Sequence, residues 1–167
     1  MVGSSIARRD LTGGAHWNYS SASDEMTKQI KEARHAPLAL TAQAGKALGH
    51  PTRLRLLAML RHGPLCVCQM TAVIEQASST VSGHLLELKR AGLVTEEKRG
   101  KWVEYRLRDE GPFGRWLEQA LDLLRDDPVA VRDARLVRGV SAVPLDVLCR
   151  AKLDLRKAGV RAPSPEP

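Results

Sequence analysis

The hydrophobic pattern of this 167-residue sequence changes period once, near Leu93, and this change limits its possible folds more than any other feature. Before Leu93, apolar residues recur at helical spacing in short segments that end at Gly or Pro. After it, Leu93 to Lys98 and Lys101 to Arg108 alternate apolar and polar residues around Arg99-Gly100, a pattern that predicts a β-hairpin. We therefore expect a mainly α fold that carries one small β-hairpin.

The order of the predicted elements defines the fold more closely. Helices are predicted at Leu38–Leu48, Thr52–Arg61, Val67–Glu75, Ser78–Ala91, from Pro112 to Leu124, at Pro128–Val137 and at Pro144–Ala158. Ser78 or Ser79 should cap the fourth of these helices. Val103, Tyr105 and Leu107 should face the core from the hairpin. Helix, helix, short helix, turn, helix, hairpin and helix is the order of a winged helix-turn-helix of the α+β class.

Composition and segment boundaries divide the chain into four parts. These are a flexible N-terminal arm at 1–37, a winged helix-turn-helix domain at 38–126, a C-terminal helical extension at 127–160 and a disordered tail at 161–167. Only 4% of the residues are aromatic, so the core should be aliphatic. Neither a membrane span nor a signal peptide is visible, and three cysteines make a poor disulfide framework. We therefore expect a cytoplasmic protein with free thiols and no membrane partner.

A formal charge of +7 and a helix with two different faces point to double-stranded DNA as the partner. On the fourth helix Val81, Leu85 and Leu88 form an apolar stripe that should dock on the core. The opposite side has small polar side chains that can enter a major groove, and the hairpin tip has cations suited to phosphates. The predicted DNA-binding residues are Ser78, Ser79, Thr80, Ser82, Gly83, His84, Lys89, Arg90, Arg99 and Lys101.

Four motifs together resemble the ArsR/SmtB family of metal-sensing repressors. They are ALGHPTRLRLL at 47–57, STVSGHL at 79–85, RAGLV at 90–94 and GKWVEYRL at 100–107. The resemblance covers about 38–124 and implies a homodimer, formed by the first and fifth helices, that represses its own operon until metal binding releases the DNA. Family members often carry glutamine where Ser78 stands and arginine where Gly83 stands, so the operator sequence and the affinity for it do not follow from the resemblance.

Cys66-Val67-Cys68 lies at the start of the third helix, where the resemblance implies a site for soft thiophilic ions. Thiolates are the ligands that such ions prefer, and a helix N-terminus should lower the thiol pKa. Residues i and i+2 of a regular helix diverge by about 200°. We therefore expect ion binding to unwind or re-aim the first helical turn and so to move the reading helix that packs against it. The alternative is that both cysteines are simply small buried side chains.

A third thiolate would complete a site for arsenic(III) or antimony(III). Some family members have a third cysteine where this chain has Thr71, so Cys149 is the remaining candidate, from the same subunit or from its partner. The alternative is that Cys149 is a packed core or dimer residue.

The sequence thus predicts a repressor that leaves its operator when arsenite or antimonite binds, without an organic cofactor. The alternatives are a repressor that responds to cadmium, lead or thiol oxidation, and an architectural DNA-binding protein. No nucleotide loop or nucleophile–base pair suggests an enzyme. The scattered His16, His35, His50 and His62 are interpreted as structural or solvated.

Overall fold

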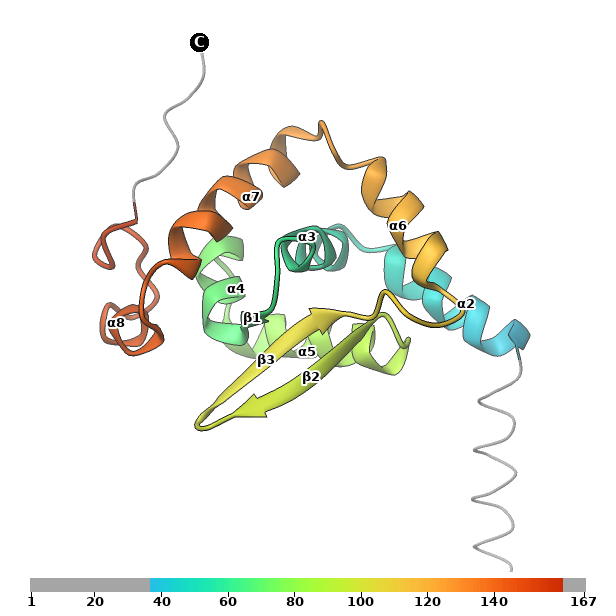
Figure 1. The fold of residues 1–167 in the computed structure, drawn as a ribbon, viewed down its shortest axis with the longest axis horizontal. Helices are drawn as coiled ribbons and strands as arrows, with labels where there is room; N and C mark the ends of the chain where they lie inside the picture. The colour runs from blue at the N-terminus through green and yellow to red at the C-terminus, as the bar shows by residue number, and fades with distance from the viewer. Residues whose placement is uncertain (1–36, 161–167) are drawn as a thin grey trace, which may run out of the picture. The chain divides into compact units, whose positions relative to one another are not determined.

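The computed structural model describes residues 37–160, and Figure 1 shows how their elements are arranged. The elements are α2 (Pro37–Leu48), α3 (Pro51–Leu60), β1 (Leu65–Cys66), α4 (Val67–Ile74), α5 (Ser78–Arg90), β2 (Val94–Arg99), β3 (Trp102–Leu107), α6 (Gly114–Asp122), α7 (Pro128–Ser141) and α8 (Leu145–Arg150). This order confirms the predicted winged helix-turn-helix. The predictions for the N-terminal arm, the C-terminal tail, His16 and His35 lie outside the described residues.

The helix-turn-helix is formed by α4 and α5, which pack against each other and against α3. His50 caps α3, because its Nδ1 accepts a hydrogen bond of 3.1 Å from the backbone N–H of Thr52. Pro51 occupies the first helical position, where its missing N–H costs nothing. Glu75 ends α4 in the left-handed conformation at φ 61°, which turns the chain sharply before α5 begins at Ser78.

The wing is the antiparallel hairpin β2–β3, whose turn is Gly100-Lys101 with Gly100 at φ 60°. The predicted inward direction is confirmed for Tyr105, which is buried, but it is wrong for Val103, which is 37% exposed. The reason is that the hairpin extends beyond the helices that it packs on, as Figure 1 shows. The sequence analysis also missed β1, which pairs with β3. A strand of two residues is too short to show an alternating pattern.

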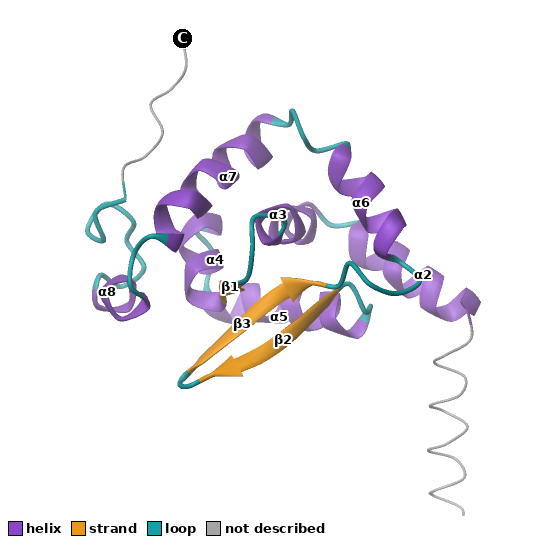
Figure 2. Cartoon of the chain, viewed as in Figure 1, coloured by secondary structure: helices purple, strands orange, loops and turns teal. Residues whose placement is uncertain are grey.

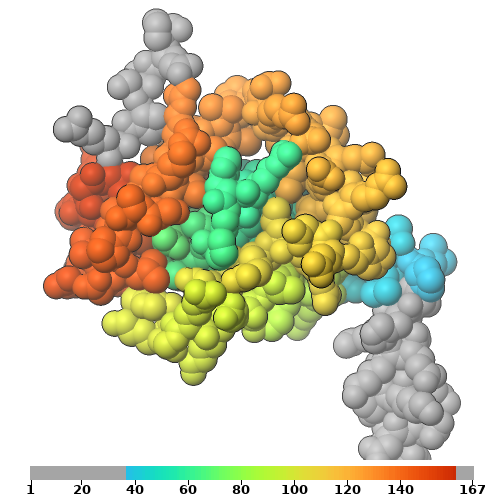
Figure 3. Space-filling view, viewed as in Figure 1, coloured from blue at the N-terminus to red at the C-terminus, as the bar shows by residue number. Residues whose placement is uncertain are grey.

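The C-terminal extension shares the core of the DNA-binding domain. Leu136, Val137 and Val140 of α7 and Leu148 of α8 belong to the same apolar cluster as Val73 of α4. Figure 2 shows α7 lying across α3 and α4, in agreement with the contacts between these helices. In the space-filling view of Figure 3, the green chain at the end of α3 reaches the surface between orange α7 and amber α6.

The last predicted helix, Pro144–Ala158, is too long. It ends at Arg150, because Lys152 and Leu153 have φ of 54° and 64°, which no right-handed helix can accommodate. Turns follow up to Val160. Between residues 37 and 160 no helix is long and apolar enough to cross a membrane.

Candidate functional site

The reading helix α5 has the two faces that the sequence predicts. Val81, Leu85 and Leu88 are fully buried against the core. The side away from them is exposed and includes most of the predicted DNA-binding residues of this helix, namely Ser78, Ser79, Thr80, Ser82, Gly83, Lys89 and Arg90. The predicted serine cap is wrong: Ala77 is the capping residue, and Ser78 and Ser79 are the first two helical residues. Their hydroxyls lie exposed at the positive end of the helix, where phosphates bind favourably.

His84 differs from the other predicted DNA-binding residues because it is half-buried. Its ring lies 4.5 Å from the ring of His50, between centroids, and thus joins the reading helix to the cap of α3. Burial, followed by the neighbouring His50 and Arg53, lowers the pKa of His84 below its usual value. The imidazole is therefore mainly neutral near pH 7, so one of its ring nitrogens donates a hydrogen bond and the other accepts one.

The predicted cations of α5 and the wing have partners within the chain. Lys89 bonds to Glu96, and the Arg90 guanidinium lies 2.8 Å from Glu87. At the wing, Arg99 lies 3.2 Å from Glu104, and Lys101 lies over the ring of Trp102. These groups are exposed, so each ion pair contributes at most about 1 kcal/mol. The side chains can therefore exchange their partners for phosphates at little cost.

Cys66 and Cys68 lie close together in the free protein. Cys66 ends β1 in an extended conformation, with φ −77° and ψ 158°, and serves as the cap of α4. Its N–H donates a hydrogen bond of 2.9 Å to the side chain of Gln69. The two thiols influence each other's pKa, in addition to the larger effect of burial. The predicted divergence of about 200° does not apply, because Cys66 is the extended residue before the helix and only Cys68 lies within it.

The predicted lowering of the thiol pKa is also wrong. Burial is the main cause of a raised pKa at both residues, and it raises the pKa of Cys68 to about 12. Loss of hydration disfavours a thiolate here more than the helix end favours it. Both thiols are therefore protonated in the free protein at neutral pH.

Cys149 lies near the same two thiols within one chain. It is exposed on α8, which packs against α4, and it interacts electrostatically with both Cys66 and Cys68. Nevertheless, between residues 37 and 160 no three His, Cys, Asp or Glu side chains are close enough to hold a metal ion as they stand. The three cysteines thus lie on two packed elements but do not form a ready-made three-ligand group in the described part of the chain.

Thr71 has a feature that the sequence analysis did not anticipate. Its hydroxyl is buried on α4, and no hydrogen-bond partner for it lies in the described part of the chain. Thr71 follows Cys68 by three residues, so the two side chains lie on the same face of α4. Only the folded structure could reveal this unpaired hydroxyl, since the sequence shows threonine there and nothing about its partners.

The fold and the exposed face of α5 define a winged-helix DNA-binding protein. The sequence model of the family described as "Bacterial regulatory protein, arsR family" matches residues 50–96. An Escherichia coli protein named "Arsenical resistance operon repressor" is 37% identical over 84 residues, which are 50% of this chain and 70% of that protein. The chain belongs to the ArsR family of transcriptional regulators.

Two further relatives and one solved structure are similar to this chain. "Arsenic resistance transcriptional regulator ArsR1" of Pseudomonas putida is 39% identical over 77 residues, which cover 46% of this chain and 59% of that protein. A Staphylococcus aureus protein named "Cadmium resistance transcriptional regulatory protein CadC homolog" is 41% identical over 70 residues, which cover 41% of this chain and 58% of that protein. The structure of HlyU from Vibrio cholerae has 29% identity and a TM-score of 0.48, covering 53% of this chain and 96% of that one.

Proposed function

We propose that this protein is a transcriptional repressor that leaves its operator when arsenite or antimonite binds to Cys66, Cys68 and Cys149. The observation that carries the proposal is the position of Cys66 and Cys68 at the start of α4, on which the helix α8 that bears Cys149 is packed. Relatives whose names include arsenic or arsenical resistance, at 37% and 39% identity, support this choice of effector.

The chemistry of the three side chains fits a soft trivalent ion. Sulfur ligands favour such ions over hard cations. Arsenite carries three hydroxyl groups, and each thiol can replace one of them while its proton leaves in a water molecule. Three new sulfur bonds therefore require no thiolate in the free protein, so the raised pKa values of Cys66 and Cys68 are compatible with binding.

The coupling to DNA follows from the packing of three helices. Cys149 lies on α8, which packs on α4, and α4 packs on the reading helix α5. Drawing Cys149 onto the Cys66–Cys68 pair would pull α8 toward the start of α4. We propose that the movement of α8 shifts α4 without unwinding it, and that this shift of α4 displaces α5 from the DNA groove.

DNA binding is assigned to the exposed face of α5, including His84 at its flank, and to Arg99 and Lys101 of the wing. The active species is proposed to be a homodimer joined through α2 and α6. In the single chain, Leu38 and Leu123 are 83% and 86% exposed, and Trp116 is exposed beside Gly45 of α2. Large apolar groups exposed on both helices indicate a surface that a second subunit would cover.

A gel-shift titration with arsenite on the DNA upstream of the gene tests the proposal. Wild-type protein should be released at low arsenite concentration, whereas Cys66→Ser and Cys68→Ser should bind DNA normally and resist release. Thr71→Val, which removes only the buried hydroxyl, is a control that should still release. Normal release of the Cys149→Ser variant would remove Cys149 from the site and leave a two-thiol site.

A second effector class is favoured by one observation. A relative named for cadmium resistance matches with 41% identity, so the same titration is repeated with cadmium, lead and peroxide. Release by cadmium or peroxide but not by arsenite would transfer the proposal to those effectors. Binding that no effector changes and that shows no sequence preference would indicate an architectural protein.

A further inference from the structure

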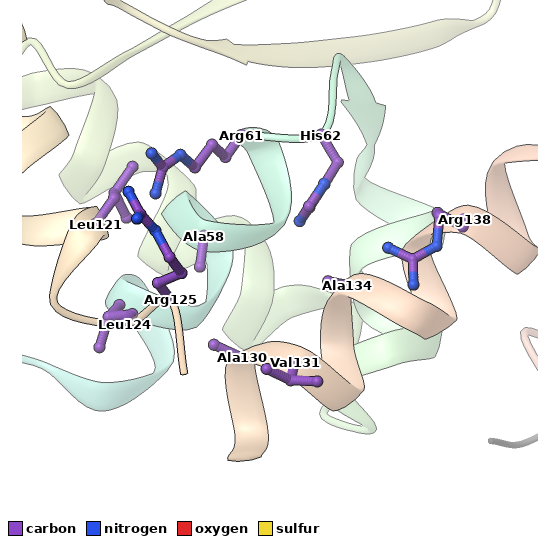
Figure 4. A pocket seen from close by; sticks show the side chains of 10 residues that line it. All are labelled: Ala58, Arg61, His62, Leu121, Leu124, Arg125, Ala130, Val131, Ala134 and Arg138. Atoms are coloured by element: carbon purple, nitrogen blue, oxygen red, sulfur yellow. The ribbon is translucent and has the colours of Figure 1, made fainter. Parts of the chain in front are cut away.

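A basic cavity lies outside both the DNA-binding face and the thiol site. It has a volume of about 340 Å³ and lies where the end of α3, the end of α6 and one side of α7 meet (Figure 4). No residue that lines it belongs to α5, the wing or the cysteine cluster. The volume falls within the range of about 300 to 1,000 Å³ typical of small-molecule sites.

The charge of the cavity wall is unbalanced. Arg61 and Arg125 both bond to the single carboxylate of Asp122, the second at 3.1 Å. Arg138 forms no ion pair with any residue in the described part of the chain, and no carboxylate there lines the cavity. Two of the three guanidinium charges are thus uncompensated. Guanidinium groups recognise carboxylates and phosphates through paired N–H donors.

His62 adds a polar group between the arginines. In Figure 4 its ring points into the space between α3 and α7, and the guanidinium of Arg138 extends toward it from α7. Burial, followed by the charges of Arg138 and Arg61, lowers the pKa of His62. A neutral imidazole in this position can donate a hydrogen bond to an anion without being protonated.

The remaining wall of the cavity is apolar. Leu121 of α6 and Leu124, which follows that helix, line the cavity together with Ala134 and its neighbours on α7. Contact with such a wall adds little binding free energy for an inorganic ion, whereas a compact hydrocarbon group binds more tightly when its apolar surface is buried there. The two kinds of wall together select a ligand with an anionic head and an apolar body.

We propose that this cavity binds a small organic anion with a carboxylate or phosphate head and a compact apolar body. The head lies between Arg138 and His62, and the body packs on α6 and α7. A bound molecule links the DNA-binding domain to the C-terminal extension, because α3 and α6 belong to the first and α7 to the second. It therefore stabilises the position of α7 in the absence of any arsenic ligand.

Calorimetric titration of the full-length protein tests the proposal with benzoate and phenyl phosphate as probes. Benzyl alcohol and inorganic phosphate are the matched controls that lack the charge and the apolar body, respectively. We expect saturable binding of at least one probe, with a raised unfolding temperature, and at least about tenfold weaker binding of both controls. The better of the two probes identifies the head group. No saturable binding of either probe at millimolar concentration overturns the proposal.

Two variants and one control variant locate the binding in this cavity. Arg138→Gln should weaken probe binding by about tenfold or more, because one charged hydrogen-bond partner is lost. Arg132→Gln makes the same change on α7 outside the cavity and should bind the probes as wild type does. Ala134→Leu, which fills the apolar part, should also weaken binding. Equal binding by the Arg138 and Arg132 variants, or a change of oligomeric state or operator affinity in Arg138→Gln alone, overturns the proposal in favour of a subunit or DNA contact.

Discussion

Arg55 and Asp133 form an ion pair that fastens the C-terminal extension to the DNA-binding domain. The Arg55 Nε and Nη2 atoms of α3 donate hydrogen bonds of 2.7 and 3.0 Å to the two carboxylate oxygens of Asp133 on α7. The side chain of Asp133 is 1% exposed and that of Arg55 is 24% exposed. The pair also holds the pKa of Arg55 above its usual value, chiefly through the hydrogen bond to Asp133.

Because the two side chains are unequally buried, removing Arg55 and removing Asp133 should lower the free energy of unfolding by different amounts. Arg55→Met retains an apolar stem but leaves a carboxylate buried without a counter-charge, which should lower the free energy of unfolding by about 3 to 5 kcal/mol. Asp133→Ala leaves a guanidinium that can still reach water, so only the charged hydrogen bonds are lost, at about 1.5 to 3 kcal/mol. The double variant Arg55→Met/Asp133→Leu should cost less than Arg55→Met alone, because no unpaired charge remains.

Urea unfolding of all four proteins at one protomer concentration measures these differences. The arsenite concentration needed for release from DNA, measured in parallel, reports whether α7 still holds α8 in place. Both single variants should release less readily, because Cys149 is then less well positioned. The reasoning is refuted if Asp133→Ala costs as much as Arg55→Met, or if the double variant costs the sum of the two.

Three further predictions concern the reading helix, the start of α6 and pH. Gly83→Ala should raise the free energy of unfolding by about 0.5 to 1 kcal/mol, since nothing lies within 4 Å of the added Cβ; urea unfolding measures this, and a gel shift shows whether the methyl group weakens operator binding. Gly114→Ala should lower the free energy of unfolding by about 1 to 3 kcal/mol, because the Cβ would lie 1.9 Å from the carbonyl oxygen of Asp109; thermal unfolding measures the loss. The pKa values of His62 and His84 are lowered in the folded chain. As the pH falls below about 6.5, these histidines therefore take up protons more readily in the unfolded chain than in the folded one. The free energy of unfolding should then fall as the pH falls. Urea unfolding at pH 7.5, 6.5 and 5.5 should show this slope, and His84→Gln and His62→Gln should each reduce it.

Each of these predictions has a control or a contrary outcome. Gly45→Ala would place its Cβ 3.7 Å from Trp116, an ordinary contact, and should cost less than Gly114→Ala. A Gly83→Ala protein less stable than wild type would mean that the helix interior is not free at that position. A pH slope that neither histidine substitution changes would assign the effect to other groups.

Local sequence signals were sufficient for most of the elements. Pro51 and Gly100 mark a helix start and a hairpin turn through backbone preferences that do not depend on the rest of the fold. The stripe of Val81, Leu85 and Leu88 predicts the buried side of α5 for the same reason. The exposure of Val103 could not be predicted, because it depends on where the helices beneath the hairpin end.

The residues of the proposed thiol site come from the sequence alone, whereas their geometry depends on the folded chain. The chemistry of three cysteines, two of them at i and i+2, indicates soft-ion binding from the sequence alone. The backbone conformation of Cys66 depends on the pairing of β1 with β3, a contact distant in the sequence. The raised thiol pKa values depend on burial, which only the packed core produces.

The sequence by itself determined the winged helix-turn-helix and the polar face of its reading helix, since both follow from local periodicity and turn residues. The tertiary structure alone decided that α8, which carries Cys149, packs on α4, at whose start Cys66 and Cys68 lie. It also decided that α7 is held on α3 through Arg55 and Asp133. Both are contacts between residues about 80 positions apart, and such contacts depend on how all the intervening helices pack, which no local pattern encodes.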